Sequence, residues 1–260
     1  MVDVLFVTPD SSLQAYQDLA KVYSAIEPPT WAVLLSQATL SKGFSSEILD
    51  CDALRLSNKK AVEIIKDTKP KLICFVMYGQ NPNSGTTSMI GADDLARDIK
   101  DSSINSKICF IGSHVSALPR EVMLNKNVDF VLINEGVYGL ISLLKTNLTD
   151  KLEKCPGLGF RKNNEIIINE GKLVPNERMH IDLPGYNWDL LPKKNKTLDL
   201  YRAHYWHSYF SEKDRQTFAA PYSSLGCAFA CNFCMINIVN RTSTEDNVDA
   251  SNFKGMRFWN

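Results

Sequence analysis

The sequence has little histidine, no excess of either charge and no long apolar run. Its 260 residues include 4 His, and Lys plus Arg equal Asp plus Glu at 29 each. A chain without net charge has no overall field to attract polyanions, which argues against nucleic acid as the main partner. No run of about 18 apolar residues is present, so no membrane span is expected. Asp3 stands where an export signal would carry basic residues, so residues 1–7 are expected to form a strand instead.

Cysteine is not distributed as in a disulfide-bonded secreted protein. Such a protein has a denser and more evenly paired set of cysteines, whereas this chain has 7, an odd number. Three are clustered near residue 230, and four, including Cys155, are scattered. We interpret Cys51, Cys74 and Cys109 as small buried hydrophobes, because free cysteine is often buried. A reducing, cytoplasmic location suits this composition best.

No GxGxxG motif follows the first apolar run, which disfavours a dinucleotide site. Residues 1–150 instead alternate apolar runs with amphipathic segments, at about 30 residues per unit. This alternation predicts a flavodoxin-like or Rossmann-like α/β fold with a parallel sheet and helices on both faces. Strands are expected at Val4–Thr8, Ser46–Asp50, Lys71–Tyr78, Lys107–Gly112 and Phe130–Ile133, and helices at Trp31–Lys42, Lys59–Thr68, Ser88–Asp101 and Val137–Leu148.

The loops that follow the predicted strands are the expected ligand-binding region. In open parallel sheets, ligands bind at the carboxyl ends of the strands, near the switch in strand order. The loops in question are Pro9–Ser12, Gly79–Thr87, Ser113–Ser116 and Asn134–Gly136. Gly79–Thr87 is rich in Gly, Asn, Ser and Thr, and it offers many donors with little bulk, as a large polar cofactor requires. Ordinary surface loops have the same composition, so both interpretations stay open.

The clustered cysteines are Cys227, Cys231 and Cys234, in the spacing CxxxCxxC. Three thiolates on one short loop can hold three irons of a four-iron four-sulfur cluster and leave the fourth iron open to a ligand that is not protein. Zinc is an alternative, but it needs a fourth ligand and its cysteines usually form two separate CxxC pairs. Chance is a further alternative, which the scarcity of cysteine disfavours.

Several stretches of residues 1–150 resemble the cobalamin-binding domain that precedes radical S-adenosylmethionine (SAM) domains. Residues 27–31 (EPPTW) and 43–50 (GFSSEILD), on either side of the first long helix, look like the beginning of that domain. Residues 110–119 (FIGSHVSALP) resemble its Gly-Gly-x-His-x-Ser/Thr-x-x-Pro loop. Residues 128–136 (VDFVLINEG) resemble its Val-Asp-x-x-x-x-Gly-Glu-Gly/Ala ending.

This resemblance implies cobalamin as a cofactor, held by loops at the carboxyl ends of the strands. The Asp-x-His-x-x-Gly motif that ligates cobalt in mutases is absent, as it often is in the family that precedes radical SAM domains. Ser113 stands where a second glycine is usual, and a loop histidine bonded to the backbone is a better interpretation of His114 than a cobalt ligand. The expected contacts are Gly79, Gln80, Gly112, Ser113, His114, Glu135 and Gly136.

Residues 151–215 are expected to form a hairpin followed by an irregular connector. Gly157–Arg161 and Ile166–Ile168 fit two short strands, and the proline-punctuated segment beyond them is too broken for long elements. Residues 183–191 resemble a Leu-Pro-x-x-x-x-Asp-Leu-Leu stretch of the same family. His204 and His207 are spaced as a helical metal pair would be, but no third ligand is near, so an aromatic seam at the domain junction is favoured.

Residues 216–260 resemble the beginning of a radical SAM (β/α) barrel. In that family CxxxCxxC holds the 4Fe-4S cluster, which implies Cys227, Cys231 and Cys234 as metal ligands. Phe233 matches the aromatic residue that lies beside the adenine of bound SAM. Only the first strand and the cluster loop of such a barrel are expected, because a barrel needs roughly 200 residues more. The chain is therefore expected to be a truncated product, a fragment or one half of a split enzyme.

The resemblance implies a cobalamin-dependent radical SAM enzyme that methylates or rearranges a small-molecule or lipid-like substrate. An electron donor such as a flavodoxin or ferredoxin is the implied partner. Two alternatives stay open: a non-catalytic module that binds cobalamin or an iron–sulfur cluster, and a radical SAM protein whose α/β domain no longer binds cobalamin. The expected organisation is an α/β domain at 1–150, the connector at 151–215 and the incomplete radical SAM domain at 216–260.

Overall fold

The computed structural model describes residues 1–79, 82–204, 211–229, 231, 233–240 and 255–259. Its strands are β1 (Val4–Thr8), β2 (Ser46–Asp50), β3 (Leu72–Met77), β4 (Lys107–Gly112), β5 (Phe130–Leu132), β6 (Leu158–Lys162), β7 (Glu165–Ile168), β8 (Ser224–Leu225) and β9 (Arg257–Phe258). Its α-helices are α1 (Ser12–Tyr16), α2 (Ala20–Tyr23), α3 (Thr30–Ser41), α4 (Asn58–Thr68), α5 (Met89–Asp101), α6 (Ser113–Ala117), α7 (Pro119–Leu124), α8 (Val137–Lys145), α9 (Met179–Asp182) and α10 (Ile236–Val239).

One sheet of seven strands organises the molecule, in the order β2-β1-β3-β4-β5-β6-β7. Strands β1 to β5 pair in parallel. This confirms the α/β fold predicted from the sequence. The order 2-1-3-4-5 is the flavodoxin-like arrangement, whose switch point lies between β1 and β3. Leu72–Met77 is buried at every position, as a continuous apolar run predicts for a central parallel strand.

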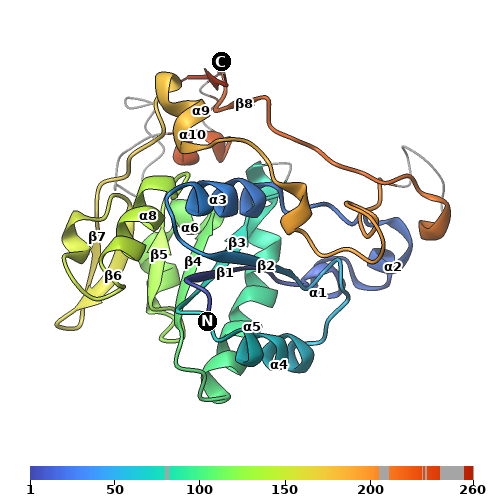
Figure 1. Cartoon of the computed structure of the whole chain (residues 1–260), viewed down its shortest axis with the longest axis horizontal. Coiled ribbons are helices and arrows are strands. Elements are labelled where there is room, and N and C mark those ends of the chain that lie inside the picture. The colour runs from blue at the N-terminus through green and yellow to red at the C-terminus, as the bar shows by residue number, and fades with distance from the viewer. Residues whose placement is uncertain (80–81, 205–210, 230, 232, 241–254, 260) are drawn as a thin grey trace.

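Helices cover both faces of the sheet (Figure 1). Helices α3 and α8 pack on one face, and α4, α5 and α7 pack on the other. Helix α3 is buried at nine of its twelve positions, which fits a helix that is apolar almost all round. Leu34 and Leu35 have no exposed surface, and each fully buried leucine contributes about 1.5–3 kcal/mol.

The hairpin β6–β7 continues the main sheet instead of leaving it for the connector. Strand β6 pairs antiparallel with β5, so Phe130 lies opposite Phe160. Gly159 makes this approach possible, because a side chain there would collide with Val131 and Ile168. The guanidinium of Arg161 donates to the carbonyls of Met123, Asn125 and Val128 and ties the hairpin to the loop before β5. The hairpin thus belongs to the α/β core.

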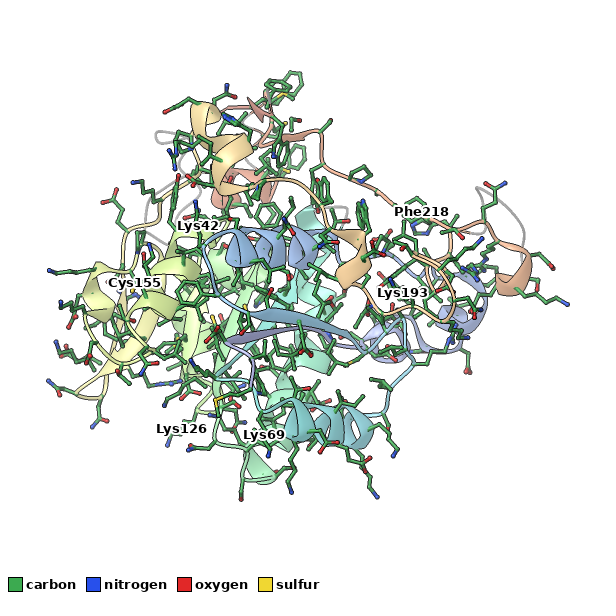
Figure 2. All side chains as sticks on the ribbon, viewed as in Figure 1. Lys42, Lys69, Lys126, Cys155, Lys193 and Phe218 are labelled. Atoms are coloured by element: carbon green, nitrogen blue, oxygen red, sulfur yellow. The ribbon has the colours of Figure 1, made fainter. Side chains whose placement is uncertain are left out.

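The connector that follows is held to the α/β core by Tyr201. This side chain has no exposed surface, and its hydroxyl donates to Asp50 Oδ2 at 3.0 Å, at the end of β2. Ile26 and Arg202 form an isolated antiparallel bridge beside it. Phe218 lies further along the same segment, on a long excursion to one side of the molecule, while Cys155 lies beside the hairpin on the opposite side (Figure 2).

The elements β8, α10 and β9 form a small C-terminal unit next to α3 and α8 (Figure 1). Strands β8 and β9 pair antiparallel with each other and are separate from the seven-stranded sheet. Helix α10 packs against α6. The strand predicted ahead of the cysteines is therefore present as β8, two residues long. Among the helices of the described residues, none has the length and apolar character that a membrane crossing requires.

Candidate functional site

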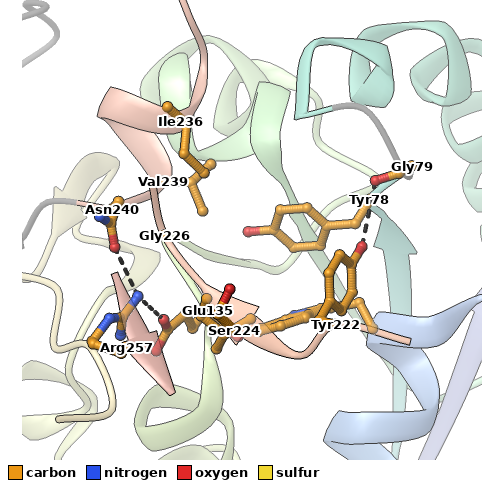
Figure 3. Close-up of a pocket in the computed structure, with 12 residues that line it drawn as sticks. Tyr78, Gly79, Glu135, Tyr222, Ser224, Gly226, Ile236, Val239, Asn240 and Arg257 are labelled. Atoms are coloured by element: carbon orange, nitrogen blue, oxygen red, sulfur yellow. Dashed lines mark hydrogen bonds and ion pairs between the residues drawn. The ribbon is translucent and has the colours of Figure 1, made fainter. Parts of the chain in front are cut away.

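A cavity of about 150 Å³ lies where the C-terminal unit meets the carboxyl ends of β3 and β5 (Figure 3). Its wall is mostly apolar and comes from both sides of this contact, with polar groups of Glu135, Asn240 and Arg257 at one end. The lining residues are Trp31, Tyr78, Gly79, Glu135, Tyr222, Ser224, Leu225, Gly226, Ile236, Val239, Asn240 and Arg257. The cavity therefore sits at the edge of the sheet where parallel α/β folds bind ligands.

Three aromatic rings form the apolar wall. The ring of Trp31, at the start of α3, is edge-on to Tyr78 and Tyr222, with centroids 5.4 Å and 6.0 Å away. The indole N–H of Trp31 donates to the carbonyl of Glu135 at 3.2 Å, and the hydroxyl of Tyr78 donates to the carbonyl of Asn134. The polar atoms of Trp31 and Tyr78 are thus hydrogen-bonded to backbone carbonyls of the turn after β5.

Glu135 and Arg257 form a buried ion pair at the polar end of the cavity. Glu135 is 3% exposed and Arg257 is 6% exposed, and Nη2 of Arg257 lies 2.6 Å from Oε1 of Glu135. The second carboxylate oxygen accepts from the backbone N–H of Val174 at 2.8 Å. Burial raises the pKa of Glu135, while the charge of Arg257 acts in the opposite direction. Removing one partner of such a pair leaves an uncompensated buried charge.

The cysteine loop is residues 227–234, of which the structure describes all but 230 and 232. Cys231 is exposed, Cys227 and Cys234 are half-buried, and all three thiols are free of disulfides. The backbone N–H of Phe229 donates to the sulfur of Cys227 at 3.4 Å. Gly226 precedes the loop with a φ of +85°, and it lies against Gly255 and Asn240, where a side chain would collide.

The three thiols have the chemistry that an iron–sulfur cluster requires, but they do not converge. In the part of the chain that the structure describes, no group of three His, Cys, Asp or Glu residues is arranged to hold a metal ion. The predicted SAM contact Phe233 lies in the same loop and is 84% exposed. The cysteine loop therefore has the ligand types of a cluster site in an open arrangement, and its assignment stays a prediction.

The predicted cobalamin contacts divide into three groups. Gly79 and Glu135 line the cavity, whereas Gln80 lies outside the described residues. Gly112, Ser113 and Gly136 are buried. A side chain at Gly112 would collide with the carbonyl of Met77, and one at Gly85 would collide with the Ser113 hydroxyl, so these strand ends are already covered. Nδ1 of His114 lies 3.1 Å from the hydroxyl of Thr86, a side chain and not the backbone partner expected.

A corrin ring is larger than the cavity that the described residues form. Small-molecule sites usually have roughly 300–1,000 Å³, and the cavity is about 150 Å³. The carboxylate of Glu135 is used by Arg257 and Val174, so it does not face the cavity as a free acceptor.

Several residues of the site were not among the contacts predicted from the sequence. Trp31, Tyr78 and Tyr222 form the wall, and Asn134 and Arg257 join the two halves. Trp31 belongs to residues 27–31 (EPPTW), and the resemblance of this stretch to the cobalamin-binding family could have pointed to it. Arg257 has no sequence signal of its own, because its role depends on a strand pairing of only two residues.

Comparison with known structures finds the same fold in two radical SAM enzymes. The cobalamin-dependent SAM radical enzyme OxsB, with aqua-cobalamin bound, superposes with a TM-score of 0.66 at 16% identity, over 99% of this chain and 30% of OxsB. The radical SAM methyltransferase TsrM from Kitasatospora setae, with cobalamin and a [4Fe-4S] cluster bound, gives 0.59 at 16% identity, over 90% of this chain and 42% of TsrM. The chain shares its fold with cobalamin-dependent radical SAM enzymes.

The similarity is one of fold, at low sequence identity. No protein-family model matches the chain, and no curated protein matches it by sequence. The chain spans less than half the length of the two solved structures. The resemblance inferred from short motifs thus agrees with the fold of these neighbours.

Proposed function

We propose that this chain is the α/β domain and the cluster-binding beginning of a radical SAM enzyme. The observation that carries the proposal is the position of the CxxxCxxC loop. The loop follows β8 and is followed by α10, and both elements lie beside a cavity at the carboxyl ends of β3 and β5. The fold shared with OxsB and TsrM supports the same class.

In this proposal the thiolates of Cys227, Cys231 and Cys234 hold the cluster, and SAM takes the remaining iron. When bound, the cluster supplies one electron that breaks a carbon–sulfur bond of the SAM sulfonium and gives methionine and a 5′-deoxyadenosyl radical. The chain itself would position the cluster and SAM and exclude water from them. Phe233 offers an exposed ring for the adenine, and Trp31, Tyr78 and Tyr222 form the aromatic wall of the cavity beside the loop.

Cobalamin is the second proposed cofactor, supported by the bound ligands of the two neighbours. The buried Gly112 and Ser113 and the small cavity favour the alternative that this α/β domain serves as a scaffold without cobalamin. Gel filtration with hydroxocobalamin separates the two. Co-elution of stoichiometric cobalamin supports the cofactor, and a cobalamin-free protein peak supports the scaffold.

The partners follow from the chemistry. A one-electron donor such as a flavodoxin or ferredoxin is proposed to reduce the cluster, and a small-molecule or lipid-like substrate is proposed to be methylated or rearranged. The 7 cysteines are all free, which suits the reducing cytoplasm as the proposed location.

Anaerobic reconstitution with iron and sulfide tests the cluster assignment. We expect roughly four irons per chain and a visible charge-transfer band, both strongly reduced in Cys231→Ala, because the loop then offers two thiolates. Cys155→Ser is the matched control, since Cys155 is a free thiol beside the hairpin and outside the loop. Equal iron content in wild type and Cys231→Ala would contradict the proposal.

Addition of SAM and dithionite to the reconstituted chain then tests catalysis. Release of 5′-deoxyadenosine supports an enzyme. A retained cluster without this product supports the non-catalytic binding module.

A further inference from the structure

The two ends of the cysteine loop are fixed at the same place. On its N-terminal side, β8 pairs with β9, so that Leu225 lies opposite Arg257. On its C-terminal side, Cys234 leads directly into α10, which ends against Asn240. Asn237 ties α10 to the middle of the loop, because its side-chain amide donates to the carbonyl of Cys231. The position of the thiols is therefore set by whatever holds β9 and α10.

One guanidinium holds both of these ends to the α/β domain. Nη2 of Arg257 donates to Oδ1 of Asn240 at 2.7 Å and pairs with Glu135 at 2.6 Å. Nη1 of the same side chain donates to the carbonyl of Val174 at 2.9 Å. Because Arg257 is itself part of β9, it joins the strand before the loop, the helix after it and the end of β5.

The turn after β5 provides a second attachment. The side-chain amide of Asn134 donates to the carbonyls of Ile238 and Val239, at 3.1 Å each, at the end of α10. Asn134 has a φ of +57°, a left-handed conformation that asparagine adopts more readily than most residues. Asn134 thus holds α10, and Glu135 holds β9 through Arg257.

We propose that Glu135 is a positioning residue for the cysteine loop and acts through Arg257. The family resemblance implies Glu135 as a cofactor contact, whereas its carboxylate pairs with Arg257 and accepts from the backbone of Val174. The proposal rests on the proposed function only where it concerns cluster retention. The position of the thiols is measurable on the metal-free chain.

Alkylation of the metal-free protein by iodoacetamide, followed for each cysteine by mass spectrometry, tests the positioning. Cys227 and Cys234 are half-buried, so they react through local opening of the loop, while Cys231 is already exposed. Glu135→Gln keeps an acceptor for Val174 and removes the charge that holds Arg257. We expect the rates of Cys227 and Cys234 to rise about tenfold and that of Cys231 to change less than about twofold.

Asp129→Asn is the matched control. Asp129 lies just before β5, at the opposite end of the strand from Glu135, and is paired with Lys100 and Lys107. This substitution weakens the domain without touching the loop, so the ratios between the cysteine rates should stay as in wild type. Equal rate ratios in Glu135→Gln and Asp129→Asn would overturn the proposal.

The variant Asn240→Ala separates the contact of Arg257 with α10 from its contact with Glu135. It replaces Glu135→Gln in the test if that variant does not fold. It removes the bond from Arg257 to Asn240 and the bond from Asn240 to the carbonyl of Gly255, and it leaves the ion pair that holds β9 to Glu135 in place. Faster alkylation of Cys234 with unchanged Cys227 is the expected result. Unchanged rates at both cysteines would overturn the proposal.

Iron content after reconstitution distinguishes failure of the two proposals. If wild type retains no iron, the proposed cluster function fails, and the alkylation pattern still decides whether Glu135 positions the loop. If wild type retains iron, we expect Glu135→Gln to lose most of it on desalting and Arg257→Lys, which keeps the charge, to retain more. Full retention by Glu135→Gln with wild-type alkylation rates overturns the positioning role.

Discussion

The difference in the free energy of unfolding between Asp50→Asn and wild type should favour the variant more at neutral and alkaline pH than at acidic pH. Asp50 is 1% exposed, and burial raises its pKa from 3.8 to about 6. Its carboxylate accepts from Tyr201 and from the backbone N–H of Ala53. An asparagine has the same shape and keeps an oxygen for Ala53, and a hydroxyl can donate or accept, so the contacts are retained.

The sign and the size follow from the two pKa values. Between pH 4 and pH 6 the folded chain keeps a proton on Asp50 that the unfolded chain has released. The contribution of Asp50 to the free energy of unfolding therefore falls as the pH rises through this window and is level above it. The difference between 3.8 and about 6, at 1.36 kcal/mol per pKa unit, corresponds to about 3 kcal/mol. Asp50→Asn lacks this loss. It also removes a charge that helps to raise the pKa of Asp52 to about 7, which adds in the same direction.

Urea unfolding followed by tryptophan fluorescence at several pH values from 4 to 8 measures the effect. The difference between Asp50→Asn and wild type should grow by about 3 kcal/mol across this range. Asp3→Asn is the control, because Lys71 and Ser45 lower the pKa of Asp3 to about 2. Its stabilising effect is complete above pH 4, so its curve should run parallel to wild type from pH 5 to 8. A parallel curve for Asp50→Asn would refute the reasoning.

Two further predictions concern the core and the turn beneath the site. Leu35→Ala should lower the free energy of unfolding by about 2–5 kcal/mol in the same urea assay, since Leu35 is fully buried, whereas Leu124→Ala, at an exposed position, should change it by less than about 0.5 kcal/mol. Gly136→Ala should cost about 1–3 kcal/mol or more by thermal unfolding, because Gly136 has a φ of +70° and a side chain would collide with Ile111; a midpoint equal to wild type would contradict this.

The strands were predictable because each apolar run ends at turn residues. Three strands have the bounds predicted from the sequence, namely Val4–Thr8, Ser46–Asp50 and Lys107–Gly112. The hairpin was recognised as a hairpin, but its pairing with β5 was not, since antiparallel addition to a parallel sheet depends on the close approach that Gly159 allows.

The site was predictable only in part. The carboxyl ends of the strands pointed to Gly79 and Glu135, and the cysteine spacing pointed to the loop. The contact that joins them was not predictable, because Asn134 and Val239 are 105 residues apart and no local pattern records their hydrogen bond. Gly112 illustrates a second difficulty. A small residue at a strand end suits a bound ligand and close packing equally, and here it packs on Met77.

The attachment of the cysteine loop to the turn after β5 has a consequence for the order of folding. Closing a chain segment of 105 residues costs more entropy than forming neighbouring strands, so this contact should form late. The parallel sheet must exist first, because Asn134 and Glu135 take their positions from β5. In a chain that refolds from the unfolded state, the half-buried thiols of Cys227 and Cys234 should therefore stay accessible until the sheet is complete.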